Sequence, residues 1–328
     1  MTYQKMFDEI RASDRLKQEV QNMTNQKTNC VRGRSIPRVV LIAAIVVVLL
    51  AGTTLAANLF GIRDWFAEQW QEETGSTIST DQLGLIDQLT QEINVSDTKN
   101  GVTVTVDSVT RGEGILWMLL EIDGDFSIPE DSSAYFAAPF TLDFSPELEI
   151  AGSAWQFTGG GFREDGSWMV LLRYVPPLTG DATFLDAYDV ALTMETLMWN
   201  GEITAEGPWN LNFSLEQIDP PETLTLDGTI TADAISMEHP DTPTKIEFYD
   251  IRVTPTEIWL TSESQENILK VFASWGLVLK DGTEIHNEGG VYYDLPDGIQ
   301  ASVYYWSVPV NLSQVSGLSS GTETFPLN

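Results

Sequence analysis

Few residues in this 328-residue chain could do nucleophilic or acid–base chemistry. Its two histidines, His239 and His286, both stand in turn-like contexts. The string Gly317-Leu-Ser-Ser-Gly321 matches the nucleophile-elbow pattern of serine hydrolases. However, no helix pattern follows it and both histidines precede it, whereas that fold needs the histidine after the serine. The sequence therefore predicts no hydrolytic triad.

Metal and cofactor chemistry has no clear signature either. Asp123 with Asp125, and Asp186 with Asp189, could bind a hard cation such as calcium, but neither pair has the spacing of a calcium-ligand loop. Turn residues on a solvated face are the alternative reading in a chain with 48 Asp and Glu residues. No glycine-rich loop precedes a helix, and no His/Cys pair has transition-metal spacing. We expect no cofactor, no metal site and no enzyme activity.

The feature that organises the chain is the run Val39 to Ala57, which carries no charge. At 1.5 Å per residue it spans about 29 Å, close to the hydrocarbon core of a bilayer. Residues 1–38 hold eight Lys and Arg against four Asp and Glu, so the positive-inside rule predicts a cytoplasmic N-terminus. A cleaved secretory signal ending near Ala57 is the alternative, but the apolar run and the segment before it are long for a signal peptide. We expect a single-pass protein of the cell membrane with its C-terminal region outside.

The predicted exterior is strongly acidic. Beyond residue 38 there are nine Lys and Arg against 44 Asp and Glu, and the net charge of the chain is −31. This charge repels nucleic acid, so we expect no nucleic-acid partner. The one cysteine, Cys30, lies on the predicted cytoplasmic side, so no intrachain disulfide is expected and core burial must hold the fold.

Residues 1–23 form a predicted cytoplasmic helical head, joined to the membrane by a basic tether at 24–38. Apolar residues recur there at helical spacing, with a change of phase near Ser13. Helices this short are marginal in water, so the apolar stripe needs a partner or a membrane; a disordered tail is the alternative. The expected partner-binding residues are Phe7, Ile10, Leu16, Val20 and Met23.

Two helical patterns follow the membrane segment within residues 58–93, which we expect to form juxtamembrane helices or a stalk. The first places Trp65, Phe66 and Trp70 on one face, where an outer aromatic belt would lie; packing of this face on a β domain is the equal alternative. Together with Arg34 and Arg38 they are the expected membrane-interface residues. The second pattern follows a cap at Thr80-Asp81 and takes in Leu83, Ile86, Leu89 and Ile93.

From Ile93 the hydrophobic period changes from 3.6 to 2, which indicates strands. Asn100-Gly101 between two alternating runs predicts a hairpin. Strands are expected at 115–122, 140–144, 168–174, 190–194 and 209–215. Turns are expected at 123–124, 159–161, 165–166 and 200–201. This alternation of short strands and turns predicts a first β-sandwich over residues 94–219.

After Asp219-Pro220-Pro221 the alternation of strands and turns begins again, and it predicts a second sandwich over residues 220–328. Strands are expected at 223–230, 245–253, 258–261, 274–279 and 301–310. Laying Val109-Thr110 over Val253-Thr254 superposes apolar positions of the two regions, although the repeat is one of pattern more than of sequence. The expected fold class is mainly β: two tandem immunoglobulin-like β-sandwich domains outside, one transmembrane helix, and the short helical head.

The order of these features resembles a family of membrane-tethered regulators of clostridia-like Gram-positive bacteria, described as anti-sigma factors. The resemblance rests on four segments: Phe7-Asp-Glu-Ile-Arg-Ala-Ser-Asp-Arg-Leu-Lys17, Ala56-Ala-Asn-Leu-Phe-Gly-Ile-Arg-Asp64, Asn100-Gly-Val-Thr-Val-Thr-Val106 and Gly207-Pro-Trp-Asn-Leu-Asn-Phe213. In that family an extracellular domain of unknown function is often followed by an immunoglobulin-like one.

The resemblance implies that the head binds an extracytoplasmic-function sigma factor. The head departs from the zinc-binding anti-sigma pattern, because it has no histidine and Cys30 is its one cysteine. A zinc-free contact through short helices is therefore expected. The expected function is a membrane signalling regulator of this kind. The alternative is a surface-displayed binding or structural module with no cytoplasmic partner.

Overall fold

The computed structural model describes residues 61–327, except 125, 127–135, 149, 151–154, 164–165, 177, 179–181, 237–242, 264–267, 272–274, 296–298 and 322. The chain divides into two compact units, Met1–Ala57 and Asn58–Asn328. The predicted head, tether and membrane segment lie outside the described residues, and so do the expected site residues Phe7, Ile10, Leu16, Val20, Met23, Arg34 and Arg38. Within the described part, no helix is both long and apolar enough to cross a membrane.

Two helices open the second unit, α4 (Ile62–Thr74) and α5 (Thr80–Leu89). Gly75, with φ of 66°, ends α4 in the left-handed conformation that glycine adopts without strain. The Ser79 hydroxyl caps α5 by accepting a hydrogen bond from the Gln82 N–H at 3.2 Å. The sequence pattern extended the second helix to Ile93, but the chain turns into a strand at Thr90. The expected stalk is therefore two short helices, and both bury residues against the β structure.

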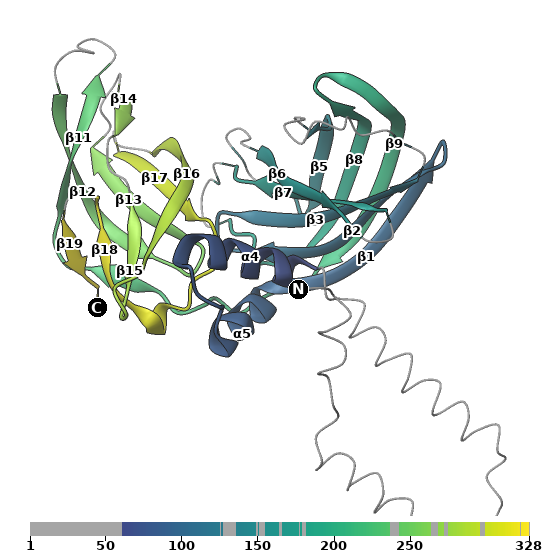
Figure 1. Cartoon of the computed structure of the whole chain (residues 1–328). Coiled ribbons are helices and arrows are strands. Elements are labelled where there is room, and N and C mark those ends of the chain that lie inside the picture. The colour runs from purple at the N-terminus through teal and green to yellow at the C-terminus, as the bar shows by residue number, and fades with distance from the viewer. Residues whose placement is uncertain are drawn as a thin grey trace, which may run out of the picture. The chain divides into compact units, whose positions relative to one another are not determined.

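The first sandwich packs two antiparallel sheets around one apolar core (Figure 1). One sheet has the order β1-β2-β3-β7-β6, with β1 Thr90–Lys99, β2 Val102–Arg111, β3 Leu116–Gly124, β7 Trp168–Tyr174 and β6 Trp155–Phe162. In the other sheet β9 (Glu202–Leu215) lines one edge of β8 (Tyr188–Trp199), and β4 (Phe136–Ala137) and β5 (Phe140–Ser145) share the opposite edge. The core lies between these sheets.

Local turn chemistry explains most of these hairpins. Asn100 and Gly101 have φ of 51° and 81°, and Asn200 and Gly201 have 52° and 82°, as a type I′ turn requires. Both predicted turns are confirmed. The predicted turn at Gly159–Gly161 is wrong, because these glycines lie inside β6, where the pairing with β7 shifts register between Thr158 and Gly161. Glycine in a strand here marks a bulge and not a reversal.

The strands of the second sandwich form one ten-stranded hydrogen-bonded sheet. Its order is β14-β11-β12-β13-β17-β16-β15-β18-β19, with β10 also paired to β12. The strands are β10 Leu224–Leu226, β11 Ile230–Ser236, β12 Pro243–Val253, β13 Glu257–Glu263, β14 Ile268–Val271, β15 Gly276–Leu279, β16 Glu284–Leu295, β17 Ile299–Trp306, β18 Val315–Ser319 and β19 Thr324–Pro326. The start of β16 pairs with β15 and the rest pairs with β17, so β16 connects the two parts of the sheet.

The mainly β fold, consistent with β-sandwiches, is therefore confirmed. The strand expected at 223–230 contains β10 but meets only the first residue of β11. The sequence pattern missed β4, β6, β14, β16, β18 and β19.

Candidate functional site

The first part of the candidate site is the buried face of α4. Ile62, Phe66 and Trp70, four residues apart along the helix, are at most 4% exposed. They belong to a cluster that joins the outer face of β3 and β7, including Trp117 and Leu171, to the core of the second sandwich. The Phe66 and Trp117 rings meet edge to face with centroids 5.6 Å apart. The helix therefore forms part of one core shared by both sandwiches.

This burial corrects the expected membrane interface. Phe66 is 0% exposed and Trp70 is 4% exposed, so neither side chain can contact lipid. Trp65 is partly buried and packs against the same cluster. The alternative weighed from the sequence, in which this face packs on protein, holds, and the surface it meets includes the second sandwich as well as the first.

Helix α5 is fastened to the second sandwich through one buried amide. Gln82 is 0% exposed. Its Nε2 donates to the Pro309 carbonyl, and its Oε1 accepts from the Asn311 N–H at 2.7 Å. A side-chain amide that satisfies a backbone donor and a backbone acceptor fixes both position and angle. The helix pair is thus held to the loop after β17.

Two equivalent turns meet at the centre of the junction between the sandwiches. In the β2–β3 turn the Gly112 N–H donates to the Ile115 carbonyl, and in the β12–β13 turn the Thr254 N–H donates to the Glu257 carbonyl, both at 2.8 Å. The Gly114 N–H of the first turn donates to Glu257 Oε1 of the second at 2.9 Å. Arg252, at the end of β12, forms an ion pair with Glu113 in the first turn.

A second ion pair crosses the same junction. Arg173 on β7 pairs with Glu288 on β16, and it also donates to Gln156 Oε1 at 2.7 Å. Its guanidinium lies 4.5 Å from the centre of the Tyr305 ring on β17, a cation–π contact. Burial lowers the pKa of Arg173 from its usual value, although a guanidinium remains charged at neutral pH. We call the two turns, the two ion pairs and the buried face of α4 the sandwich junction.

Arg111 braces the first sandwich directly beside the junction. Its side chain is buried and donates to the carbonyls of Phe184, Asp186 and Glu216, the first two at 3.1 and 3.2 Å. Burial lowers its pKa to about 10, and the charge of Glu216 opposes that shift. The end of β2 is therefore tied to the loop before β8 and to the residue after β9, which sets the position of the β2–β3 turn.

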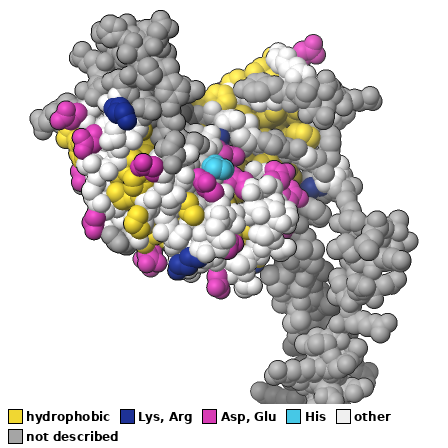
Figure 2. All heavy atoms as spheres, turned by 60° about the vertical axis from the view of Figure 1, so that its left-hand side comes forward, with side chains coloured by type: hydrophobic (Ala, Val, Ile, Leu, Met, Phe, Trp, Pro, Cys, Tyr) yellow, Lys and Arg dark blue, Asp and Glu magenta, His cyan; other side chains and the backbone are white. Residues whose placement is uncertain are grey.

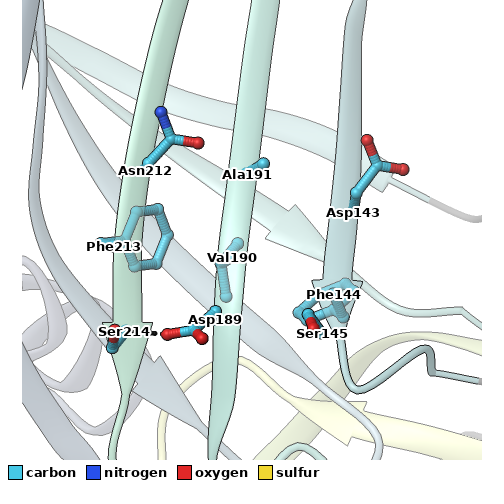
Figure 3. A pocket seen from close by; sticks show the side chains of 9 residues that line it. All are labelled: Asp143, Phe144, Ser145, Asp189, Val190, Ala191, Asn212, Phe213 and Ser214. Atoms are coloured by element: carbon cyan, nitrogen blue, oxygen red, sulfur yellow. Dashed lines mark hydrogen bonds between the residues drawn. The ribbon is translucent and has the colours of Figure 1, made fainter.

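A separate groove crosses the outer face of β5, β8 and β9 (Figure 3). Its volume is 360 Å³. Asp143, Asp189 and Ser214 project along this face, and the Ser214 hydroxyl donates to Asp189 Oδ1 at 2.6 Å. The rest of the lining combines Ser145 and Asn212 with the apolar residues Phe144, Val190, Ala191 and Phe213. Such a surface can bind a small ligand through its carboxylates and hydroxyls.

Among the described residues, those weighed for catalysis or metal binding do not assemble into a site. Gly317 and Ser319 belong to the strand β18, so the Gly317–Gly321 string is not a nucleophile elbow. His286 is exposed and lies 3.8 Å from Glu284, while His239 and Asp125 lie outside the described residues. Across the described ranges, no three His, Cys, Asp or Glu side chains are grouped to hold a metal ion.

Sequence reasoning missed the junction entirely. The signal available was the placement of charged residues in turns between strongly apolar strands, at Arg111-Gly-Glu-Gly114 and at Arg252 to Glu257. In an acidic chain, charged residues in turns are expected to lie on a solvated surface. The pairs Arg252–Glu113 and Glu257–Gly114 lie 139 and 143 residues apart in sequence, so no local pattern could pair them.

The chain matches no protein-family model and no curated protein. Among solved structures, a conserved domain protein from Bacillus anthracis is 14% identical over 71% of this chain and 77% of its own, with a TM-score of 0.45. The N-terminal periplasmic domain of ScsB from Proteus mirabilis is 10% identical over 72% of this chain and 99% of its own, with a TM-score of 0.21.

Proposed function

We propose that this chain is a single-pass membrane signalling regulator, anti-sigma-factor-like, which couples an extracytoplasmic sensing region to a cytoplasmic sigma factor. The observation that carries the proposal is the burial of α4 in the sandwich junction. The helix begins at Ile62, only a few residues after the predicted membrane segment ends at Ala57. A sensing region that must act through a membrane needs such a firm attachment.

A β domain on a flexible linker would turn freely and pass no conformational change to a transmembrane helix. Here Phe66 and Trp70 fill a close-packed core, and interiors of that kind transmit displacement because they have little free volume. A ligand or force that changes the sandwich junction would therefore shift α4, and with it the segment that leads into the membrane.

The cytoplasmic output is assigned to the head. Its apolar residues Leu16, Val20 and Met23 have the i, i+4, i+7 spacing of a helix that binds in a groove. Each buried anchor contributes about 1.5–3 kcal/mol before ordering costs, so loss of two weakens binding about tenfold or more. The contact is zinc-free, because the head has no histidine and a single cysteine, Cys30.

The test is capture of sigma factors by residues 1–37 used as bait, together with transcription of the regulated genes in cells with the full chain. Leu16→Asp and Val20→Asp should each weaken capture and release transcription, whereas Lys17→Ala, on a face that should stay solvated, should do neither. As a control on topology, N-terminal peptides should be found in the membrane fraction attached to full-length chain. Capture by the Asp variants equal to that of the parent would rule out the stripe as the interface.

The alternative function is a surface-displayed binding module, and the groove of Figure 3 favours it. It spans three strands, and Asp143, Asp189 and Ser214 along it are suited to bind a polar extracellular ligand. If residues 1–37 bind no cytoplasmic protein and head variants leave transcription unchanged, this alternative replaces the signalling role.

A further inference from the structure

Glu257 occupies an unusual position at the centre of the sandwich junction. It is 0% exposed, and its carboxylate lies between the two turns. Oε1 accepts the Gly114 N–H at 2.9 Å, and a Cβ placed on Gly112 would lie only 2.6 Å from Oε2. The side chain of one sandwich is thus packed directly against the backbone of the other.

Comparison of the two turns shows that the fold does not need a carboxylate there. Each turn closes with the same backbone hydrogen bond, and the residue that matches Glu257 in the first turn is Ile115, which is 1% exposed. An apolar residue at such a position gains from burial, whereas a carboxylate loses its hydration. The second sandwich therefore carries a group at this position that costs stability when it is ionised.

The charged and titratable groups around Glu257 come from three elements. Glu113 faces it from the β2–β3 turn, and Arg252 faces it from β12 while paired with Glu113. Tyr305 is its cross-strand partner on β17. Burial raises the pKa of Glu257 to about 7; the Thr256 hydroxyl, the Gly114 N–H and Arg252 oppose that rise, and the charge of Glu113 adds to it.

We propose that Glu257 makes the sandwich junction responsive to pH: the neutral carboxyl packs between the turns, and the ionised carboxylate loosens their contact. The direction of the pH effect follows from which state of the junction binds the proton more tightly. The packed junction holds the proton more tightly than the separated turns do, so the junction is firmest at acidic pH and weakens as the pH rises from about 4.5 through about 7. This inference goes beyond the proposed function and does not depend on the cytoplasmic head.

The test is hydrogen exchange of the full chain in detergent micelles at pH 5.5 and pH 8, with exchange times scaled to the intrinsic rate at each pH. Peptides that contain Gly112 and Gly114 should be protected about 25-fold less at pH 8, from the difference between the two proton affinities. Glu257→Gln, which keeps the shape and the acceptor but cannot ionise, should remove this difference. Glu257→Ile, which copies Ile115, should remove it as well.

The matched control is Glu263→Gln, an exposed residue on the same strand, which should keep the pH dependence of the parent. Equal protection of the two turns at both pH values in the parent chain would overturn the inference. So would a loss of protection at pH 8 that persists in both Glu257 variants. Neither result bears on sigma-factor capture, so failure of this inference and failure of the proposed function can be told apart.

Discussion

At the scale of single residues, the arginines beyond residue 60 all take part in structural contacts. Five arginines lie beyond residue 60, and four of them form ion pairs. Arg63 pairs with Asp87 and Arg163 with Glu121, both at 3.1 Å, while Arg173 and Arg252 cross the sandwich junction. Arg111 binds backbone carbonyls instead. In this acidic region, the arginines therefore hold together segments that carry carboxylate or carbonyl oxygens.

The tightest single position in the junction is Gly112. A Cβ there would lie 2.2 Å from Thr256 Oγ1 and 2.8 Å from Thr256 Cβ, and Thr256 is itself buried. We expect Gly112→Ala to lower the free energy of unfolding by about 1–3 kcal/mol, because a short buried side chain cannot move aside. Urea unfolding of the full chain in detergent, followed by tryptophan fluorescence, measures this change.

The control for that experiment is the same substitution on α5. Nothing lies within 4 Å of a Cβ built on Gly84, and the residue is helical. Gly84→Ala should therefore raise the free energy of unfolding by about 0.5–1 kcal/mol. A Gly112→Ala variant as stable as the parent would mean that the two turns do not pack as described.

At the scale of elements, α4 is the piece on which both sandwiches rely. Its length is modest, and a helix of this size is marginal by itself in water. Its stability comes from the stripe Ile62, Phe66 and Trp70, which the shared core covers. The helix is therefore folded only because the two sandwiches are folded around it, which is the coupling that the proposed function uses.

Removing the largest contact of this stripe should show the coupling. Phe66→Ala leaves a cavity against Trp117, and we expect a loss of about 3–5 kcal/mol in the free energy of unfolding. The measurement is a thermal melt of the full chain followed by far-UV circular dichroism. Arg63→Ala on the same helix breaks an exposed ion pair and should change stability by at most about 0.5 kcal/mol. Equal effects of the two substitutions would contradict the burial of the α4 face.

At the scale of the whole molecule, two cores of different kinds stabilise the chain after residue 60. One fills the first sandwich alone. The other runs from the outer face of β3 and β7, through α4 and α5, into the second sandwich. Because this second core cannot be divided at the linker near Pro220 without exposing α4, the two sandwiches are expected to unfold together.

We therefore predict a single cooperative urea transition for the region after residue 60, with fluorescence and circular dichroism coincident. Chelator and reductant should leave its midpoint unchanged, because burial holds the fold and Cys30 lies in the predicted tether. Two separated transitions would show instead that the sandwiches are independent. A midpoint lowered by chelator would revive the cation reading of the aspartate pairs.

The sequence by itself determined the features that depend on neighbours along the chain. The strand β7 has the predicted bounds, and the Asn-Gly turns at 100–101 and 200–201 were found, because hydrophobic alternation and positive φ are local properties. The apolar stripe of α4 was likewise evident from its spacing. The mainly β class followed from these signals together.

Only the tertiary structure decided what those elements meet. Spacing shows that Phe66 and Trp70 share a face, but a bilayer and a protein core are both apolar, so the pattern cannot tell which of them covers it. The same limit hid Arg173, Glu257 and the glycines of β6. The role of a charged residue in a turn depends on a partner more than a hundred residues away. The role of a glycine in a strand depends on the register of the neighbouring strand. Burial and ion pairing are properties of the packed chain, and they exist only once its distant segments have come together.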